Sequence, residues 1–196
     1  MAGSPVVVVT GPSGAGKGTL EKVVLARLPE LALAISATTR PRRASEQDGR
    51  EYWFISDEEF TRRVAAGKFL EWVRYVSGHR YGTLRSEIDR IRAAGRVPLL
   101  DLEIEGALHV RDTVEGAVTV FVDAPSFAEL ERRLRDRATE SSGEIEERLE
   151  LAREQQKQAG EFDHVIVNDD VERAAGELEE IVRAALGAAA ATMARP

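Results

Sequence analysis

The chain contains no cysteine and only three histidines among its 196 residues. Without cysteine it can form neither disulfides nor thiolate metal sites, and this composition is typical of a reducing compartment. We therefore expect a cytoplasmic protein. The histidines are His79, His109 and His164, and because their spacing is not that of a metal site, we interpret them as structural.

Long apolar runs and net positive charge are absent as well. The longest late apolar run, residues 184–194, is too short for the about 20 residues of a membrane-spanning helix. No basic-then-apolar signal pattern opens the chain. The formal net charge is −7, whereas nucleic-acid binding needs clustered positive charge. These absences argue against a membrane protein and against nucleic-acid binding as the main function.

Apolar runs that predict strands alternate with helical patterns along a chain that is 43% hydrophobic and 31% charged. This composition is that of a globular domain with a buried core. The alternation predicts an α/β fold with a parallel sheet covered by helices on both faces. The runs that predict strands are residues 5–10, 97–102, 117–122 and 164–167.

Local signals mark several expected helix ends. Two residue pairs have the spacing of a capping box, which begins a helix, and two glycines lie where helices should end. The pairs are Ser56 with Glu59 and Ser126 with Glu129, and the glycines are Gly67 and Gly95.

Residues 6–19 read as an apolar strand that runs into a glycine-rich loop with one lysine. Such a loop holds phosphate with backbone N–H groups at the start of a helix, and the lysine completes the binding site. The glycines let the backbone approach the phosphate, and Lys17 supplies positive charge. We predict that nucleotide phosphates bind here, to Gly11, Pro12, Ser13, Gly14, Ala15, Gly16, Lys17, Gly18 and Thr19.

The loop departs from the strict G-x-x-x-x-G-K-[ST] pattern at one position, because Gly18 follows the lysine and the hydroxyl comes at Thr19. This Gly-Lys-Gly-Thr form resembles the loop of adenylate kinases. It leaves open whether Thr19 contacts a metal ion directly. The alternative is an ordinary turn between a strand and a helix. The valine strand before the loop and the apolar periodicity after it favour phosphate binding.

Two segments interrupt the alternation of strands and helices. Residues 37–83 combine clustered arginines with an aromatic stretch and predict an inserted lobe. Residues 131–159 surround a polar, charge-rich loop and predict a mobile lid. The core then consists of residues 1–36, 84–130 and 160–187, and the alanine-rich residues 188–196 are expected to be a flexible tail.

Several further segments accompany the glycine-rich loop. They are Ser-Ala-Thr-Thr-Arg-Pro-Arg-Arg at 36–43, Phe-Leu-Glu-Trp at 69–72, Tyr-Gly-Thr at 81–83, Leu-Asp-Leu-Glu at 100–103, Ala-Pro-Ser at 124–126 and Val-Ile-Val-Asn-Asp-Asp at 165–170. Because these segments follow the loop in this order, the chain resembles guanylate kinases from residue 6 to residue 183. The resemblance implies a P-loop NTPase-type sheet with an inserted nucleotide-binding lobe and a helical lid. It also implies an enzyme that transfers a phosphoryl group from ATP to GMP, with Mg²⁺ as cofactor. ATP and GMP are then the expected partners, and monomer and homodimer both remain open.

The resemblance places the phosphate of GMP on Arg40, Arg43, Tyr52 and Tyr81, and it adds Glu46 to the GMP site. Planar guanidinium groups and a phenol suit a phosphate dianion, since they neutralise it without acting as bases.

The resemblance also implies how guanine is recognised. Guanine carries two donors on its pairing edge, N1–H and the exocyclic amine, so carboxylates should select it over adenine. Glu71 and Asp101 are placed on these donors, and Ser36 and Thr83 near the O6 acceptor.

Phosphoryl transfer needs positioned anions and neutralised charge rather than an acid or base of unusual pKa. By family analogy, Arg133, Arg137 and Arg148 reach the ATP phosphates and the transition state, and Lys17 completes the catalytic set. Asn168 is expected to border the adenine of ATP.

Magnesium is expected on the ATP phosphates rather than in an all-protein cage. The residues expected to contribute, mainly through water, are Thr19, Asp101 and Glu103.

Three positions depart from the usual family pattern. Pro41 stands one position earlier than the family's proline, so the path of the loop around Arg42 can differ from that of the family. We interpret Arg42 itself as a solvated surface arginine. Glu105 replaces a frequent glutamine and adds charge near the base and the metal. Residues 136–138 read Asp-Arg-Ala in place of Gly-Arg-Gly, which we expect to stiffen the lid.

Three other functions are compatible with parts of the pattern. Ribose 1,5-bisphosphate kinases share this loop but should lack the guanine-reading acids Glu71 and Asp101. Non-catalytic peptide-binding modules that resemble guanylate kinases typically lose the loop lysine or the lid arginines, whereas Lys17 and Arg133 are present here. A GTP-hydrolysing switch would need an Asn-Lys-x-Asp motif, which the chain lacks. The sequence therefore favours an ATP-dependent GMP kinase.

Overall fold

The structure is a computed structural model, and it describes residues 5–75, 78–136 and 142–193. Five strands form a parallel central sheet: β1 (Val6–Thr10), β2 (Leu31–Leu33), β7 (Val97–Asp101), β8 (Ala117–Asp123) and β9 (His164–Val167). Their order is β2-β7-β1-β8-β9, and every neighbouring pair is parallel. The predicted α/β class with a parallel sheet is confirmed.

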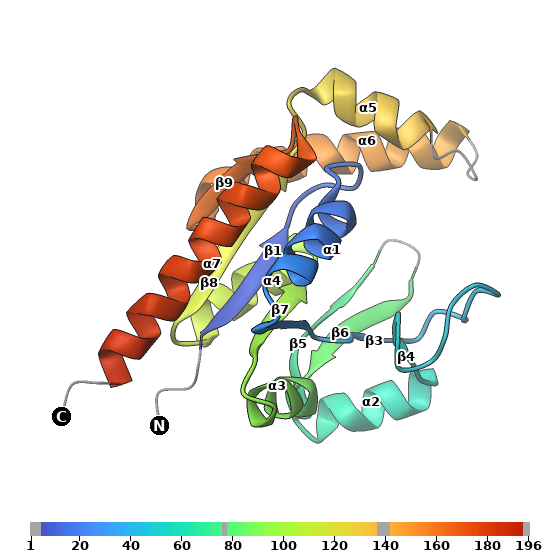
Figure 1. The fold of residues 1–196 in the computed structure, drawn as a ribbon. Helices are drawn as coiled ribbons and strands as arrows, with labels where there is room; N and C mark the ends of the chain where they lie inside the picture. Colours follow the sequence, from blue (N-terminus) through green and yellow to red (C-terminus); the bar gives the residue numbers. More distant parts are fainter. Residues whose placement is uncertain (1–4, 76–77, 137–141, 194–196) are drawn as a thin grey trace.

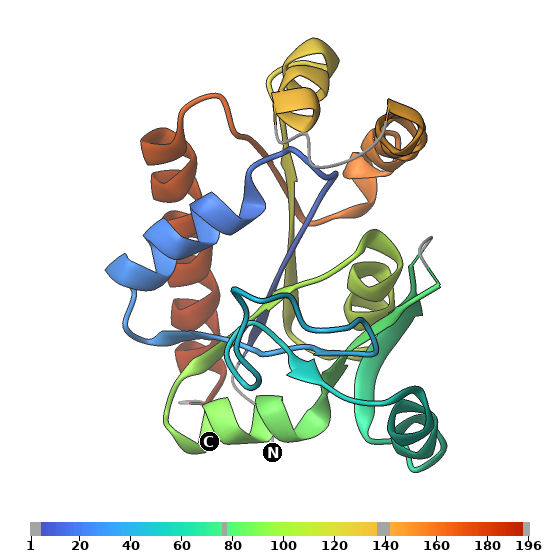
Figure 2. The ribbon, with the colours of Figure 1, turned by 90° about the vertical axis from the view of Figure 1, so that its right-hand side faces the viewer.

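Helices cover both faces of this sheet, as Figures 1 and 2 show from two sides. One face is covered by α1 (Lys17–Arg27) and α7 (Val171–Met193), and the other by α3 (Arg85–Ala93) and α4 (Ile104–Thr113).

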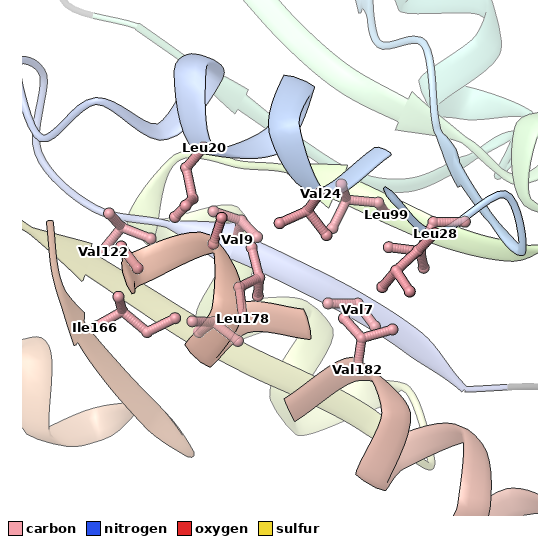
Figure 3. Packing of buried hydrophobic residues seen from close by; sticks show 14 of the residues in the cluster. Val7, Val9, Leu20, Val24, Leu28, Leu99, Val122, Ile166, Leu178 and Val182 are labelled. Carbon is pink, nitrogen blue, oxygen red and sulfur yellow. The ribbon is translucent and has the colours of Figure 1, made fainter. Parts of the chain in front are cut away.

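The central strand β1 is buried on both faces, which explains its unbroken run of valines. Side chains alternate along a strand, so Val7 and Val9 pack on the α1 and α7 side while Val6 and Val8 pack on the α3 and α4 side. All four are at most 1% exposed. Figure 3 shows the first of these clusters, with side chains of α1 and α7 closing over the strand.

The predicted helix starts and ends are confirmed. The hydroxyl of Ser56 accepts a hydrogen bond from the N–H of Glu59 at 3.2 Å, and Ser126 accepts one from Glu129 at 3.2 Å. The two glycines predicted to end helices both have positive φ.

A second sheet has four strands, and all four lie within residues 37–84. This segment contains the predicted inserted lobe. Its strands are β3 (Ala37–Thr38), β4 (Trp53–Phe54), β5 (Phe69–Arg74) and β6 (Arg80–Leu84), in the order β4-β3-β6-β5. Helix α2 (Asp57–Ala65) packs on this sheet, and the ring of Phe60 stacks on Phe69 with 4.4 Å between centroids. We call this unit the small-sheet lobe.

Helices α5 (Phe127–Asp136) and α6 (Ser142–Gln156) lie above the end of β1 (Figure 1). They pack against each other through leucines such as Leu130, Leu134 and Leu149. A Cβ placed on Gly14 would lie 3.1 Å from Cγ of Leu134, so α5 rests on the loop that follows β1. A 3-10 turn, η1 (Ala159–Glu161), then leads to β9.

Helix α7 continues to Met193, whereas the sequence predicts a flexible tail from residue 188. Alanine has the highest helix propensity of all residues, which explains why this alanine-rich segment extends the helix. Residues 194–196 lie outside the described part of the chain. Within the described residues, no helix is both long enough and apolar enough to cross a membrane.

Candidate active site

The glycine-rich loop at residues 11–16 connects the C-terminal end of β1 to α1 and needs glycine for steric reasons. Gly11, Gly14 and Gly16 have φ of +136°, +92° and +90°, a region that favours glycine. A Cβ on Gly11 would lie 2.0 Å from the carbonyl oxygen of Val122. Gly16 forms the N-cap of α1 without a side-chain hydrogen bond, so the first N–H groups of the helix are available to an anion.

Lys17, at the start of α1, lies folded over this loop. Its ammonium donates hydrogen bonds to the carbonyl oxygens of Gly11 at 2.6 Å and of Pro12 at 3.4 Å. Its charge also lowers the pKa values of Asp101 and Glu103, against the effect of burial. The lysine is therefore positioned between the loop and the acids at the end of β7.

A cavity of about 320 Å³ lies beside the loop, and we call it the loop cavity. It is lined by Gly14, Gly16, Thr19, Arg133, Asp136, Asn168, Asp169 and Val171. The structure therefore brings together three predicted side chains, Thr19, Arg133 and Asn168, that are far apart in sequence.

Hydrogen bonds hold the walls of the loop cavity in place. Arg133 donates to the carboxylate of Glu129 at 2.8 Å and to the carbonyl oxygen of Asn168 at 3.1 Å. The amide of Asn168 donates to the carbonyl oxygen of Ala15 at 2.8 Å. Side-chain hydrogen bonds from Arg132 and Arg133 lower the pKa of Glu129 to about 2, so this acid is ionised beside both arginines at neutral pH.

The other two predicted lid arginines are placed differently. Arg148 is half-buried on α6, and its charge, like that of Lys17, lowers the pKa of Glu103, so both cations act on the same acid. Arg137 lies outside the described residues.

A second cavity, of about 170 Å³, lies between the small-sheet lobe and the end of β7, and we call it the carboxylate cavity. It is lined by Ser36, Tyr52, Glu71, Val73, Tyr75, Tyr81, Gly82, Asp101, Leu102 and Glu103. Five residues predicted to bind GMP thus meet in one cavity: Ser36, Tyr52, Glu71, Tyr81 and Asp101.

The acids of the carboxylate cavity have raised pKa values. Burial raises the pKa of Glu71, which is 5% exposed, and the N–H of Thr83 opposes this rise by donating to its Oε1 at 2.8 Å. Asp101 and Glu103 line the cavity and are partly open to solvent. The surrounding protein partly desolvates their carboxyl groups, and this raises the pKa of each. Burial and the charge of Asp101 raise the pKa of Tyr52 to about 12, so its phenol remains a hydrogen-bond donor.

Thr83 lies behind Glu71 and is 1% exposed. It is not among the residues that line the carboxylate cavity. Its hydroxyl is buried beside the carboxylate of Glu71 and, like its backbone N–H, lowers the pKa of that acid. In this structure Thr83 contributes to the site by orienting Glu71.

Of the two predicted phosphate-binding arginines, Arg40 lies beside Tyr52, which lines this cavity. Arg40 donates to Oε1 of Glu46 at 2.7 Å, and its guanidinium lies 5.5 Å from the ring centre of Tyr52. The backbone N–H of Arg43 donates to Oε2 of Glu46 at 2.8 Å, and the Arg43 side chain is exposed. The rings of Tyr52 and Tyr81 meet edge to face at 5.8 Å. Glu46 thus holds the arginine loop rather than lining the cavity.

Two of the three departures from the family pattern, Pro41 and Glu105, lie among the described residues, whereas residues 137–138 of the third lie outside them. The carbonyl oxygen of Pro41 accepts a hydrogen bond from Arg40 at 2.8 Å. Arg42 donates to the backbone carbonyl of Glu46, so this exposed arginine is bonded within the loop rather than only solvated as predicted. Glu105 lies exposed in the first turn of α4.

Some site residues escape prediction from the sequence. Val73 and Tyr75 line the carboxylate cavity. Alternate residues of a strand share a face, so the spacing puts Val73 on the same face of β5 as Glu71, with Tyr75 one residue past the end of the strand, and this alternation is the signal that could have found them. Glu21 is 5% exposed, and its Oε1 has no hydrogen-bond partner among the described residues. It follows Lys17 by four positions in α1, a spacing that puts both on one helix face.

Both cavities include residues at the C-terminal ends of parallel strands, where open α/β sheets bind their ligands. A phosphate loop at the end of the central strand, a helix pair above it and an acid-lined cavity beside it define a P-loop kinase.

The chain belongs to the guanylate kinase family, whose sequence model matches residues 3–185. It is 47% identical over 178 residues to the guanylate kinase of Symbiobacterium thermophilum, covering 91% of this chain and 84% of the relative. It is 49% identical over 172 residues to the guanylate kinase of Synechococcus sp. (strain CC9902), covering 88% of this chain and 91% of the relative.

A solved structure agrees with this assignment. The crystal structure of guanylate kinase from Anaplasma phagocytophilum superimposes with a TM-score of 0.75 at 28% identity, covering 93% of this chain and 86% of that chain. The family resemblance is confirmed, and the protein is an enzyme that converts ATP and GMP to ADP and GDP. The family generally uses ATP together with magnesium.

Proposed function

We propose that phosphoryl transfer takes place between the two cavities, with ATP phosphates on the glycine-rich loop and GMP in the carboxylate cavity. The influence of Lys17 on the pKa of Asp101 supports this arrangement, because it means that the two sites adjoin. An oxygen of the GMP phosphate then attacks the γ-phosphorus of ATP, and the bond to the bridging oxygen breaks to release ADP. Positioning the two anions in line supplies much of the rate.

The residues for ATP are those of the loop and its neighbours. Backbone N–H groups of residues 11–19 bind the phosphates, and Lys17 exchanges its carbonyl partners for phosphate oxygens, which are stronger acceptors. Arg133 and Asn168 line the loop cavity and extend the site toward adenine.

Glu71 and Asp101 read guanine in this proposal. Both acids line the carboxylate cavity and can accept the N1–H and the amine of the base, with Ser36 on the same wall. Adenine would present a lone pair where guanine presents N1–H and would leave a buried acceptor unpaired. The hydrogen bond from Thr83 fixes the carboxylate of Glu71 for this contact.

Arg40, Arg43, Tyr52 and Tyr81 bind the GMP phosphate. The pairing of Arg40 with Glu46 and its contact with the Tyr52 ring support this role, because they hold the guanidinium beside the cavity. The exposed Arg43 side chain is available to a phosphate at the open end of the site.

Arg133, Arg137 and Arg148 neutralise the charge that develops on the transferred group. We propose that the lobe of residues 37–83 and the lid of residues 131–159 close over the core of 1–36, 84–130 and 160–187. Closure excludes water, which would otherwise accept the phosphoryl group.

The residues present fit a magnesium ion that is held mainly by ATP. Among the described residues, no group of three or more His, Cys, Asp and Glu could hold a metal ion. Thr19, Asp101 and Glu103 would hold the ion, mainly through water. When bound, Mg²⁺ neutralises charge on the transferred phosphates. We also propose a cytoplasmic location, which the lack of cysteine supports.

The observation that carries the proposal is the meeting of Glu71 and Asp101 in one cavity next to Lys17. An ADP-release assay with GMP, AMP, UMP and ribose 1,5-bisphosphate as acceptors tests it. We expect activity with GMP only, and we expect Glu71→Ala to raise the KM for GMP by roughly tenfold or more while the KM for ATP is unchanged. Wild-type GMP kinetics in this variant would refute the assignment of Glu71.

A further inference from the structure

Gly106 occupies a place in the fold where the backbone itself does not require glycine. It lies in the first turn of α4 and is not among the glycines with positive φ. Inside a helix glycine costs about 1 kcal/mol relative to alanine. A reason for glycine must therefore come from what surrounds the position.

That reason is the side chain of Glu71. Glu71 lies on β5, and its carboxylate packs directly against the backbone of Gly106. A Cβ on Gly106 would lie 2.6 Å from Oε2 and 3.3 Å from Cδ of Glu71. Ordinary van der Waals contact begins at 3.4 Å, so a methyl group would have to displace the carboxylate.

The carboxylate has little freedom to move away from such a methyl group. Its other oxygen, Oε1, accepts the N–H of Thr83 at 2.8 Å, and the residue is 5% exposed. Glu71 is thus held between a donor on β6 and the bare Cα of Gly106 on α4. Any displacement lengthens the Thr83 hydrogen bond, changes the direction of the carboxylate, or both.

Three other helical glycines of the described part of the chain do not share this environment. A Cβ on Gly18, Gly176 or Gly187 would meet nothing within 4 Å. Gly176 in α7 is therefore a matched control for the general effect of a glycine-to-alanine change in a helix.

We propose that Gly106 is a specificity-determining positioning residue, whose missing side chain sets the depth and direction of the Glu71 carboxylate. The inference rests on the proposed guanine-reading role of Glu71. A hydrogen bond to a base edge weakens steeply with distance and angle. A shift of the carboxylate therefore weakens recognition of GMP but leaves the loop cavity for ATP intact.

Three variants test this inference: Gly106→Ala, Glu71→Ala and the control Gly176→Ala. Gly106→Ala should raise the KM for GMP roughly tenfold and leave the KM for ATP within about twofold of wild type. Its melting temperature should change little, because the higher helix propensity of alanine offsets the weakened hydrogen bond between Thr83 and Glu71. Gly176→Ala should leave both KM values unchanged. An unchanged KM for GMP in Gly106→Ala would overturn the inference, as would equal losses for GMP and ATP accompanied by a lower melting temperature.

The double variant Gly106→Ala/Glu71→Ala shows whether Gly106 acts through Glu71. Once Glu71 is removed, Gly106→Ala should change the KM for GMP by less than about twofold, because coupled residues are not additive. Fully additive losses would contradict the inference. If Glu71→Ala leaves the GMP kinetics unchanged, the guanine-reading role itself fails. If Glu71→Ala impairs GMP use and Gly106→Ala does not, only the role of Gly106 fails.

Discussion

The carboxylate of Glu46 binds the guanidinium of Arg40 at 2.7 Å, in an ion pair whose side chains are 11% and 14% exposed. The other carboxylate oxygen accepts the backbone N–H of Arg43 at 2.8 Å. One acid therefore holds the guanidinium of Arg40 and the backbone at Arg43, the two arginines proposed to bind the GMP phosphate. The hydrogen bond from Arg40 holds the pKa of Glu46 below its usual value, so the pair persists at neutral pH.

Glu46→Gln should therefore weaken the binding of GMP without affecting ATP. The substitution keeps the shape of the side chain but removes the charge that holds Arg40, so the arginine loses its preorganised position. We expect the KM for GMP to rise about tenfold, measured by ADP release at saturating ATP. Glu51→Gln is the control, because Glu51 accepts a backbone N–H from Gln47 in the same loop at 2.7 Å. Equal effects of the two substitutions would argue against a specific role for Glu46.

Lys17→Ala should abolish phosphoryl transfer while the protein still folds. Lys17 is the lysine of the phosphate loop, and its loss removes a positive charge from the reacting phosphates. We expect kcat to fall by about 100-fold or more, whereas GMP binding measured by calorimetry stays close to wild type. Lys22→Ala, an exposed lysine further along α1, should have no effect on kcat. A Lys17→Ala enzyme with nearly full kcat would exclude the loop as the phosphate site.

Glu21 should make the stability of the enzyme depend on pH. Burial raises the pKa of Glu21 from 4.5 to about 8, with the charge of Asp101 adding to the effect. A carboxyl with a higher pKa in the folded state favours folding when protonated, so its contribution is present below pH 4.5 and is lost as the pH rises toward 8.

Glu21→Leu removes this buried carboxyl, whose Oε1 has no hydrogen-bond partner among the described residues. The variant should be more stable than wild type by roughly 1–3 kcal/mol at pH 8, and by less at pH 5. Urea unfolding at the two pH values measures the difference, and Glu21→Gln should likewise lose the pH dependence. Parallel stability curves for wild type and both variants would contradict the raised pKa.

The fold could be predicted from the sequence wherever its signals are local. The capping pair Ser56 and Glu59 acts within three residues, and the valines of β1 show by their unbroken run that both faces of the strand are buried. The parallel sheet follows from the alternation of such runs with helices. Strand β2, of three residues, is too short to leave a clear pattern.

The site could be predicted only in part, because some of its contacts join distant segments. The phosphate loop is contiguous, and family segments point to Glu71 and Asp101. Burial of Glu21 depends on how α1 packs near the end of β7, and the contact of Gly106 with Glu71 depends on how the small-sheet lobe meets α4. A sequence pattern along one element contains neither relationship.

The guanine-reading role of Glu71 and Asp101 is tested most directly by a crystal structure with GMP and a non-hydrolysable ATP analogue bound. The proposal predicts the guanine edge in the carboxylate cavity, with N1–H and the amine donating to these two acids and the analogue's phosphates on residues 11–19. A guanine bound elsewhere, with no contact to Glu71 or Asp101, would contradict it.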